Sequence, residues 1–313
     1  MAQTRRDFLL AAGSVVLLAA CGNDDNGTGS QGTSGGGATS GSTGTGSGSG
    51  STVATTEGGG TAPSGFAVVQ RFPNSPLFTP GEARLPISLS DGQNLATTGP
   101  DSIKGQIVAE DGTVVTELVA TLRNADIAVP YWEVRANLAA AGTYVLRLEG
   151  DDGYGATFQV FEPAQVASPL TGAPLPPFDT PTVDDHRGVE PYCSLTPDPC
   201  PLHDVTLTDA LKSGKPVVYM IGTPAHCSTG TCAPGLEFLV AEHTRLGADV
   251  VMVHADVYAD DAATTVAPAV EALKVDYEPI IYFVDATGVI VDRLDGVWDS
   301  GELRERMDLF LTA

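Results

Sequence analysis

The order of apolar and polar positions divides the chain into two regions with different periods. In the first region, apolar residues alternate with polar ones over short runs, at 85–89, 103–108, 114–116, 132–138, 142–149 and 157–161. Alternation with period two is typical of strands that bury one face. Asp-Gly pairs at 111–112 and 152–153 separate neighbouring runs, and such pairs favour tight hairpin turns. The pattern predicts a β-rich unit of about six strands.

This β-rich unit, over 66–162, has no cysteine and no histidine, and its carboxylates do not cluster as a catalytic pair would. Many short strands joined by turns, without a helical pattern, predict an immunoglobulin-like β-sandwich. We expect it to act in spacing or partner contact rather than in catalysis.

The second region alternates strands with helices after a proline-rich stretch over 163–181, which predicts a semi-rigid connector. Apolar runs predict strands at 217–221, 249–257, 280–284 and 289–294, and helical patterns begin near 232, 266 and 300. Alternation of this kind predicts an α/β sheet over 182–313.

Two cysteines stand between the first apolar run of this α/β unit and the helix that follows. Four residues separate Cys227 from Cys232, and Pro279 opens a later apolar strand directly after Glu278. A helix N-terminus stabilises a thiolate, which is the reactive form of cysteine. From Pro216 onwards the sequence resembles the thioredoxin-like superfamily, in particular its membrane-tethered extracytoplasmic members. The resemblance implies a thioredoxin-like α/β domain.

The resemblance also implies a function. Cys227 would attack or be attacked in thiol–disulfide exchange with client proteins, Cys232 would resolve the mixed disulfide, and Glu278 with a cis Pro279 would contact the bound substrate. The spacing departs from the C-x-x-C of that superfamily, because four residues instead of two lie between the cysteines. The rival expectation is therefore a non-catalytic binding or assembly module with structural disulfides.

A third expectation rests on a resemblance to Sco-type copper proteins, which share this fold and carry two nearby cysteines in the same loop. They add a histidine before the proline-bearing strand, where this chain has Tyr277. His226 or His254 could substitute, since cysteine with histidine suits Cu(I). We favour ordinary roles for these histidines, at the surface or packed in the sheet, and expect no metal and no cofactor.

The N-terminal segment predicts export and anchoring. Arg5 and Arg6 precede a short apolar stretch and resemble a twin-arginine export signal, and Leu18-Ala19-Ala20-Cys21 resembles a lipobox. The apolar stretch is shorter than the roughly 20 residues that span a bilayer. We expect a signal peptide over 1–21, a lipid anchor on Cys21 in the cell membrane, and an extracytoplasmic protein. Residues 22–65, rich in Gly, Ser and Thr, predict a disordered tether.

Lipidation of Cys21 leaves four of the five cysteines, in two close pairs. Cys193 and Cys200 lie in a proline-rich loop, where we expect a structural disulfide, with a second redox pair as the alternative. The net charge of −23 argues against nucleic acid and against adhesion to anionic lipid.

Overall fold

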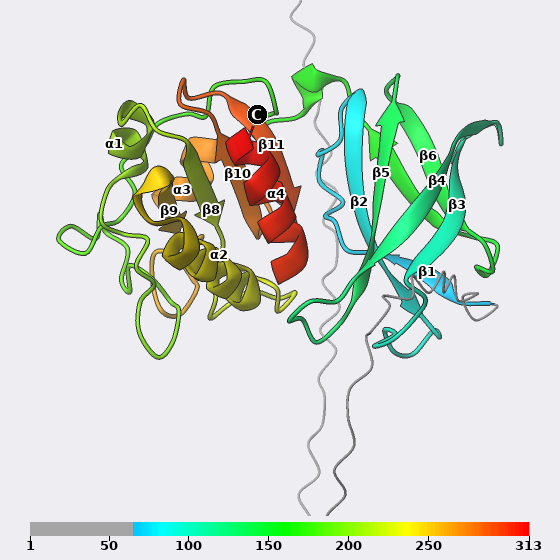
Figure 1. The fold of residues 1–313 in the computed structure, drawn as a ribbon, viewed down its shortest axis with the longest axis horizontal. Coiled ribbons are helices and arrows are strands. Elements are labelled where there is room, and N and C mark those ends of the chain that lie inside the picture. The colour runs from blue at the N-terminus through cyan, green and yellow to red at the C-terminus, as the bar shows by residue number, and fades with distance from the viewer. Residues whose placement is uncertain (1–64, 313) are drawn as a thin grey trace, which may run out of the picture. The chain divides into compact units, whose positions relative to one another are not determined.

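Seven strands from the first half of the described chain pair in one antiparallel sheet. A computed structural model describes residues 65–312 (Figure 1). The strands are β1 (Ala67–Gln70), β2 (Gly81–Ser90), β3 (Ser102–Ala109), β4 (Val114–Arg123), β5 (Tyr131–Leu138), β6 (Gly142–Leu148) and β7 (Ala156–Val160). Their order across the sheet is β1-β2-β5-β4-β3-β6-β7.

The two ends of this sheet approach each other, so the sheet is nearly closed, like a barrel. Phe78 pairs with Val160 of β7, and the Phe161 amide donates to the Phe78 carbonyl at 2.7 Å. Closure leaves few free strand edges and gives the sheet an interior. Fully buried side chains fill that interior, among them Trp132, Leu85, Ile87, Ile107 and Leu146.

Four further strands form a second sheet. They are β8 (Val217–Ile221), β9 (Val251–Ala255), β10 (Ile280–Val284) and β11 (Ile290–Asp295), in the order β11-β10-β8-β9. β8 runs parallel to β9, whereas β10 is antiparallel to both β8 and β11. β8 and β10 are buried at every position, which explains why both read as continuous apolar runs in the sequence.

Helices cover both faces of this second sheet. They are α1 (Leu207–Lys212), α2 (Cys232–Leu246), α3 (Pro268–Leu273) and α4 (Ser300–Thr312), with 3₁₀ turns η1 (Pro163–Gln165) and η2 (Gly247–Asp249). Side chains alternate along β8, so that Tyr219 packs in one apolar cluster with α1 and α3 and Met220 in another with α2 and α4. Figure 1 shows α2 and α4 beside each other, and Arg245 of α2 donates to Asp308 of α4 at 2.8 Å.

The predicted fold class, an immunoglobulin-like sandwich followed by an α/β thioredoxin-like domain, is contradicted. Within residues 65–312 the chain is mostly β, with a nearly closed seven-stranded antiparallel sheet, a four-stranded sheet and few helices, two of them six residues long. The alternating runs were identified as strands, but alternation does not determine which strands pair. Strands predicted as the two sheets of a sandwich instead join one sheet that curls toward closure.

Several predictions concern residues outside those described, namely the signal segment 1–21, Cys21 and the tether up to residue 64. Among residues 65–312, no helix combines the length and the apolar character needed to cross a membrane.

Candidate functional site

The end of β8 delivers a loop that joins two cysteines. After Ile221 the chain leaves the sheet at Gly222, forms a loop, and enters α2 directly at Cys232. Cys227 and Cys232 are linked by a disulfide, with 5.9 Å between their Cα atoms. Gly230 adopts a positive φ of 67°, and its amide donates to the Cys227 carbonyl at 3.0 Å. Glycine tolerates this conformation, so Gly230 lets the loop of four residues between the cysteines turn back on itself.

The two sulfurs of this disulfide differ in exposure. Cys232 is fully buried as the first residue of α2, whereas Cys227 is partly exposed on the loop. The Thr229 hydroxyl lies 3.2 Å from the Cys227 sulfur. A nucleophile from solvent can therefore reach Cys227 only, and Cys232 is placed to leave at a helix N-terminus that favours its thiolate.

A carboxyl group lies beside the disulfide. The peptide bond between Glu278 and Pro279 is cis, as the sequence predicts for Pro279. A Glu278 carboxylate oxygen and the sulfurs of Cys227 and Cys232 all lie within 4.8 Å of one another. The same side chain accepts a hydrogen bond from the Thr223 amide. Burial raises the pKa of Glu278 above its usual range, so this group is suited to hold a proton next to the sulfurs.

A small hollow of about 100 Å³ borders the same loop. One side is formed by the disulfide loop and the start of α2, and the other by residues that precede β5 and follow β11. Its lining includes Ile127, Ala128, Val129, Thr229, Gly230, Thr231, Pro234 and Trp298. The hollow has a partly apolar lining, which includes neither of the two cysteines.

Four further thiol and imidazole groups meet in the interior. Cys193 and Cys200 come from the proline-rich loop, His203 follows them before α1, and His254 comes from β9. All four are buried, and one ligand atom from each lies within 4.8 Å of the others. The His254 Nδ1 atom is 3.8 Å from the Cys193 sulfur, 3.7 Å from the Cys200 sulfur and 3.3 Å from the His203 Nε2 atom.

The outer nitrogen of each imidazole contacts a backbone carbonyl. The His254 Nε2 atom lies 2.8 Å from the Gly222 oxygen, and the His203 Nδ1 atom lies 3.1 Å from the Pro181 oxygen. Carbonyl oxygens only accept, so each of these nitrogens carries the proton and donates. The inner nitrogens, which face the two sulfurs, are then lone-pair donors in the neutral rings.

This arrangement corrects the prediction of a disulfide between Cys193 and Cys200, because both are free thiols in the structure. Each sulfur turns toward His254 instead. His254, one of the two histidines considered for a copper site with Cys227 and Cys232, thus lies beside Cys193 and Cys200. His226 is exposed and packs near Tyr258.

Charges inside the cluster depend on one another. The hydrogen bond from the Cys200 thiol lowers the pKa of Cys193, and the same bond raises the pKa of Cys200. Burial alone would lower the pKa of His254, but its contacts with Cys193 and the charge of Asp256 outweigh burial and raise it. Burial raises the pKa of Asp256, one of whose carboxylate oxygens has no hydrogen-bond partner.

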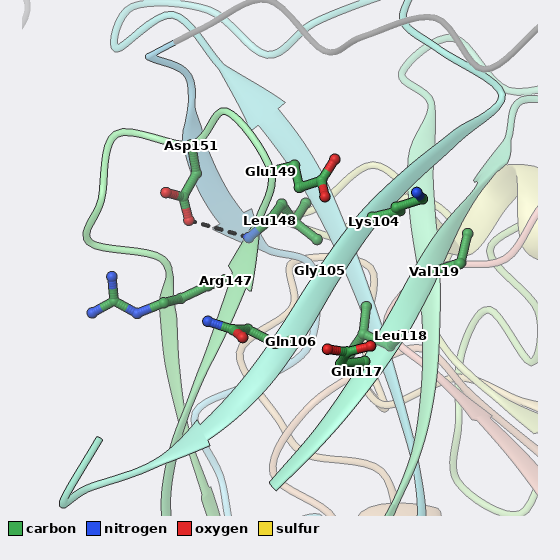
Figure 2. A pocket seen from close by; sticks show the side chains of 10 residues that line it. All are labelled: Lys104, Gly105, Gln106, Glu117, Leu118, Val119, Arg147, Leu148, Glu149 and Asp151. Carbon is green, nitrogen blue, oxygen red and sulfur yellow. Dashed lines mark hydrogen bonds between the residues drawn. The ribbon is translucent and has the colours of Figure 1, made fainter. Parts of the chain in front are cut away.

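A larger hollow lies away from all of these groups. It has a volume of about 760 Å³, lies on β3, β4 and β6, and is lined by Lys104, Gly105, Gln106, Glu117, Leu118, Val119, Arg147, Leu148, Glu149 and Asp151. Figure 2 shows the charged ends of Lys104 and Arg147 pointing away from each other. Because its charges do not converge on a common point, this hollow lacks the arrangement of a ligand site.

Comparisons with known proteins add little. No protein-family model matches the chain, and no curated protein matches it. A crystal structure of a metagenome-derived glycoside hydrolase family 9 endoglucanase is similar at 21% identity and a TM-score of 0.21, over 30% of this chain and 18% of that chain. Similarity that weak carries no argument about function, and it gives the predicted thioredoxin-like class no support.

Sequence reasoning identified Cys227, Cys232 and Glu278, which the structure brings together, and placed Pro279 beside them. It missed His203 altogether. The available signal was local: His203 follows Cys200 by three residues, and the two cysteines before it are seven residues apart.

Proposed function

We propose that the protein carries out thiol–disulfide exchange with client proteins at Cys227 and Cys232. One observation carries the proposal: a disulfide with one accessible sulfur, and with its buried partner at a helix N-terminus beside a carboxyl group. Exchange would take place outside the cytoplasm, where the lipid anchor expected on Cys21 would hold the protein at the cell membrane.

The reaction starts when a client thiolate attacks the Cys227 sulfur. A bond forms between the client sulfur and Cys227, the bond between Cys227 and Cys232 breaks, and Cys232 leaves with the electron pair as a thiolate. A second client thiolate then attacks the client sulfur of the mixed disulfide and releases the Cys227 thiolate. The client dithiol is oxidised to a disulfide and the protein disulfide is reduced to a dithiol. The same steps in reverse reduce a client disulfide.

Glu278 supplies the proton that the buried thiolate needs. Its carboxyl group lies within 4.8 Å of the Cys232 sulfur, and the raised pKa of Glu278 keeps a larger fraction of it protonated than that of an exposed glutamate. Transfer of this proton to Cys232 neutralises the leaving sulfur, and its return to Glu278 restores the thiolate for the reverse reaction.

A second candidate function is a non-catalytic binding module with a structural disulfide. Hydrogen bonds within the loop favour it, because the Thr231 hydroxyl donates to the Gly296 carbonyl at 2.7 Å and lies 2.7 Å from the Thr229 hydroxyl. A loop tied at several points resists the opening that exchange requires. The two candidates differ in the reduction potential of the disulfide.

Equilibration of the protein with glutathione or dithiothreitol buffers measures that potential. A value between about −120 and −270 mV is typical of exchange proteins, whereas a value below about −300 mV marks a structural bond and refutes the proposal. The Cys227 thiolate of the Cys232→Ser variant should attack a disulfide-containing peptide, release one peptide sulfur as a thiolate and remain trapped as a mixed disulfide. Absence of that adduct would equally count against exchange.

The role of Glu278 can be tested separately with Glu278→Gln. Proton transfer by a positioned side chain contributes about 10²–10⁴-fold to rates, so we expect reduction of the disulfide by dithiothreitol to slow at least about 10-fold. Glu237→Gln, which removes an exposed carboxylate from α2, is the matched control. Equal rates for the two variants would exclude Glu278 as the proton donor, while the potential would still decide on exchange itself.

A further inference from the structure

We infer that Cys193, Cys200, His203 and His254 form a closed binding site for Zn²⁺. This inference is independent of the proposed exchange activity, because it rests on different cysteines. None of the four residues is more than 3% exposed, and two come from a loop that the sequence predicts to be closed by a disulfide.

The distances between the ligand atoms match a tetrahedral metal centre. Zinc binds histidine nitrogen at about 2.0–2.1 Å and cysteine sulfur at about 2.3 Å, so tetrahedral geometry places two nitrogens about 3.3 Å apart and a nitrogen and a sulfur about 3.6 Å apart. The two inner nitrogens of His203 and His254 are 3.3 Å apart. The sulfurs of Cys193 and Cys200 are 3.8 and 3.7 Å from the His254 Nδ1 atom.

Hydrogen bonds outside the cluster hold the imidazoles in the orientation of metal ligands. His254 donates from Nε2 to the Gly222 carbonyl, and His203 donates from Nδ1 to the Pro181 carbonyl. A metal-binding histidine almost always donates its other ring N–H to such a partner. In the neutral rings, two nitrogen lone pairs then face each other at short range, and a cation between them removes that repulsion.

The donor set and its burial select the metal. Two sulfurs and two nitrogens in tetrahedral arrangement suit zinc, and a structural zinc site has four protein ligands with no open position. Binding deprotonates the thiols of Cys193 and Cys200, so that two protons are released and two thiolates coordinate the ion. Cu(I) is the competing soft ion, and the experiment below separates the two.

Such a centre would fix the proline-rich loop to β9. The loop is also linked to the disulfide loop, because the Ser194 amide donates to Asp256 at 3.0 Å and the Ala225 amide donates to the Ser194 hydroxyl at 3.3 Å. The ion would therefore support one wall of the disulfide site without contacting it.

Metal content of the full chain, purified without chelator, tests the inference first. Native mass spectrometry should show one Zn²⁺ per chain, with a mass that accounts for loss of two protons. Replacement of zinc by Co²⁺ should give the strong visible absorption of tetrahedral cobalt and a thiolate charge-transfer band. Protein without stoichiometric zinc, protein that retains copper in its place, or a disulfide between Cys193 and Cys200 in peptide maps would overturn it.

Variants locate the ion. Cys193→Ser and His254→Gln should each abolish stoichiometric zinc and the cobalt spectrum, whereas His226→Gln and the double variant Cys227→Ser/Cys232→Ser should keep both. Circular dichroism identifies any variant that fails to fold. In that case the inference is decided by the zinc content of the wild-type protein in native mass spectrometry. Loss of zinc in either control would place the ion at the exposed loop and refute the assignment.

Discussion

Replacing Glu302 by glutamine removes the negative charge of a buried ion pair that joins the two sheets. Arg84 of β2 donates to both carboxylate oxygens of Glu302 in α4, each at 2.6 Å, and the Tyr131 hydroxyl donates to the same group. Arg84 also donates to the carbonyls of Asp295 at 3.1 Å and Val297 at 2.6 Å. These carbonyls keep the guanidinium in place, so the variant leaves its charge buried without the carboxylate that pairs with it directly.

The shifted pKa of Glu302 gives the size of the expected loss of stability. Burial alone would raise the pKa of Glu302, but the charge of Arg84 and the hydrogen bonds from Arg84 and Tyr131 outweigh it and lower the pKa from 4.5 to about 2. At about 1.4 kcal/mol for each pH unit, the folded state favours the ionised group by about 3 kcal/mol relative to the unfolded state. Breaking a buried pair by removal of one partner typically costs about 3–5 kcal/mol, which agrees.

Urea unfolding at pH 7 measures this difference in the free energy of unfolding. We expect Glu302→Gln to lose about 3 kcal/mol, and Glu305→Gln, whose side chain is 52% exposed, to lose less than about 1 kcal/mol. Circular dichroism and tryptophan fluorescence should give the same midpoint, because a single free energy requires a single transition.

The pH dependence supplies a second check. The depressed pKa means that the contribution of Glu302 is present above about pH 4.5 and is lost as the pH falls toward 2. The difference in the free energy of unfolding between wild type and Glu302→Gln should therefore be about 2 kcal/mol smaller at pH 3 than at pH 7. A gap below about 1 kcal/mol at pH 7, or a gap that is the same at both pH values, would refute the reasoning.

The remaining predictions concern the anchor and the packing of α2. Cys21→Ser should release the protein from the membrane fraction, and its continued fractionation with membranes would refute lipidation at Cys21. Gly235→Ala would place a Cβ atom 2.8 Å from the buried ring of Trp298, and overpacking of this kind costs about 1–3 kcal/mol in unfolding experiments. An unchanged free energy of unfolding would show that the ring moves aside.

Sequence patterns predict where the main strands and helices of residues 182–313 lie along the chain. They do not predict how the strands of the protein pair with one another. The runs at 217–221 and 280–284 predict β8 and β10 with the observed bounds, because a fully buried strand is a continuous apolar run. Helix α1 is missed, since six residues are too few for a helical period to show. The sandwich is wrong because pairing of distant strands depends on sheet closure, which no local pattern encodes.

The same limit applies to the cysteines. Cys227 and Cys232 are close in sequence and flank the start of a helix, so their pairing could be predicted. Cys193 and Cys200 are also close in sequence, and counting alone pairs them in an oxidising compartment. Their environment depends on His254 of β9, which is more than fifty residues away and whose amide donates to the Leu202 carbonyl of the cysteine loop at 3.2 Å. Proximity along the chain gives no sign of that contact.

Gly222 separates the two cysteine sites and borders both. Its carbonyl accepts the hydrogen bond from His254, and a Cβ atom on it would lie 3.5 Å from the Cys232 sulfur and 3.1 Å from Pro279. A free thiolate of Cys193 or Cys200 that reached the Cys227–Cys232 disulfide would attack it and form a mixed disulfide between the two pairs. Coordination of Cys193 by the proposed zinc ion would prevent this, because a buried, metal-bound thiolate is neither exposed nor available as a nucleophile. On our proposals, the metal therefore confines the redox chemistry to the one pair that has an accessible sulfur.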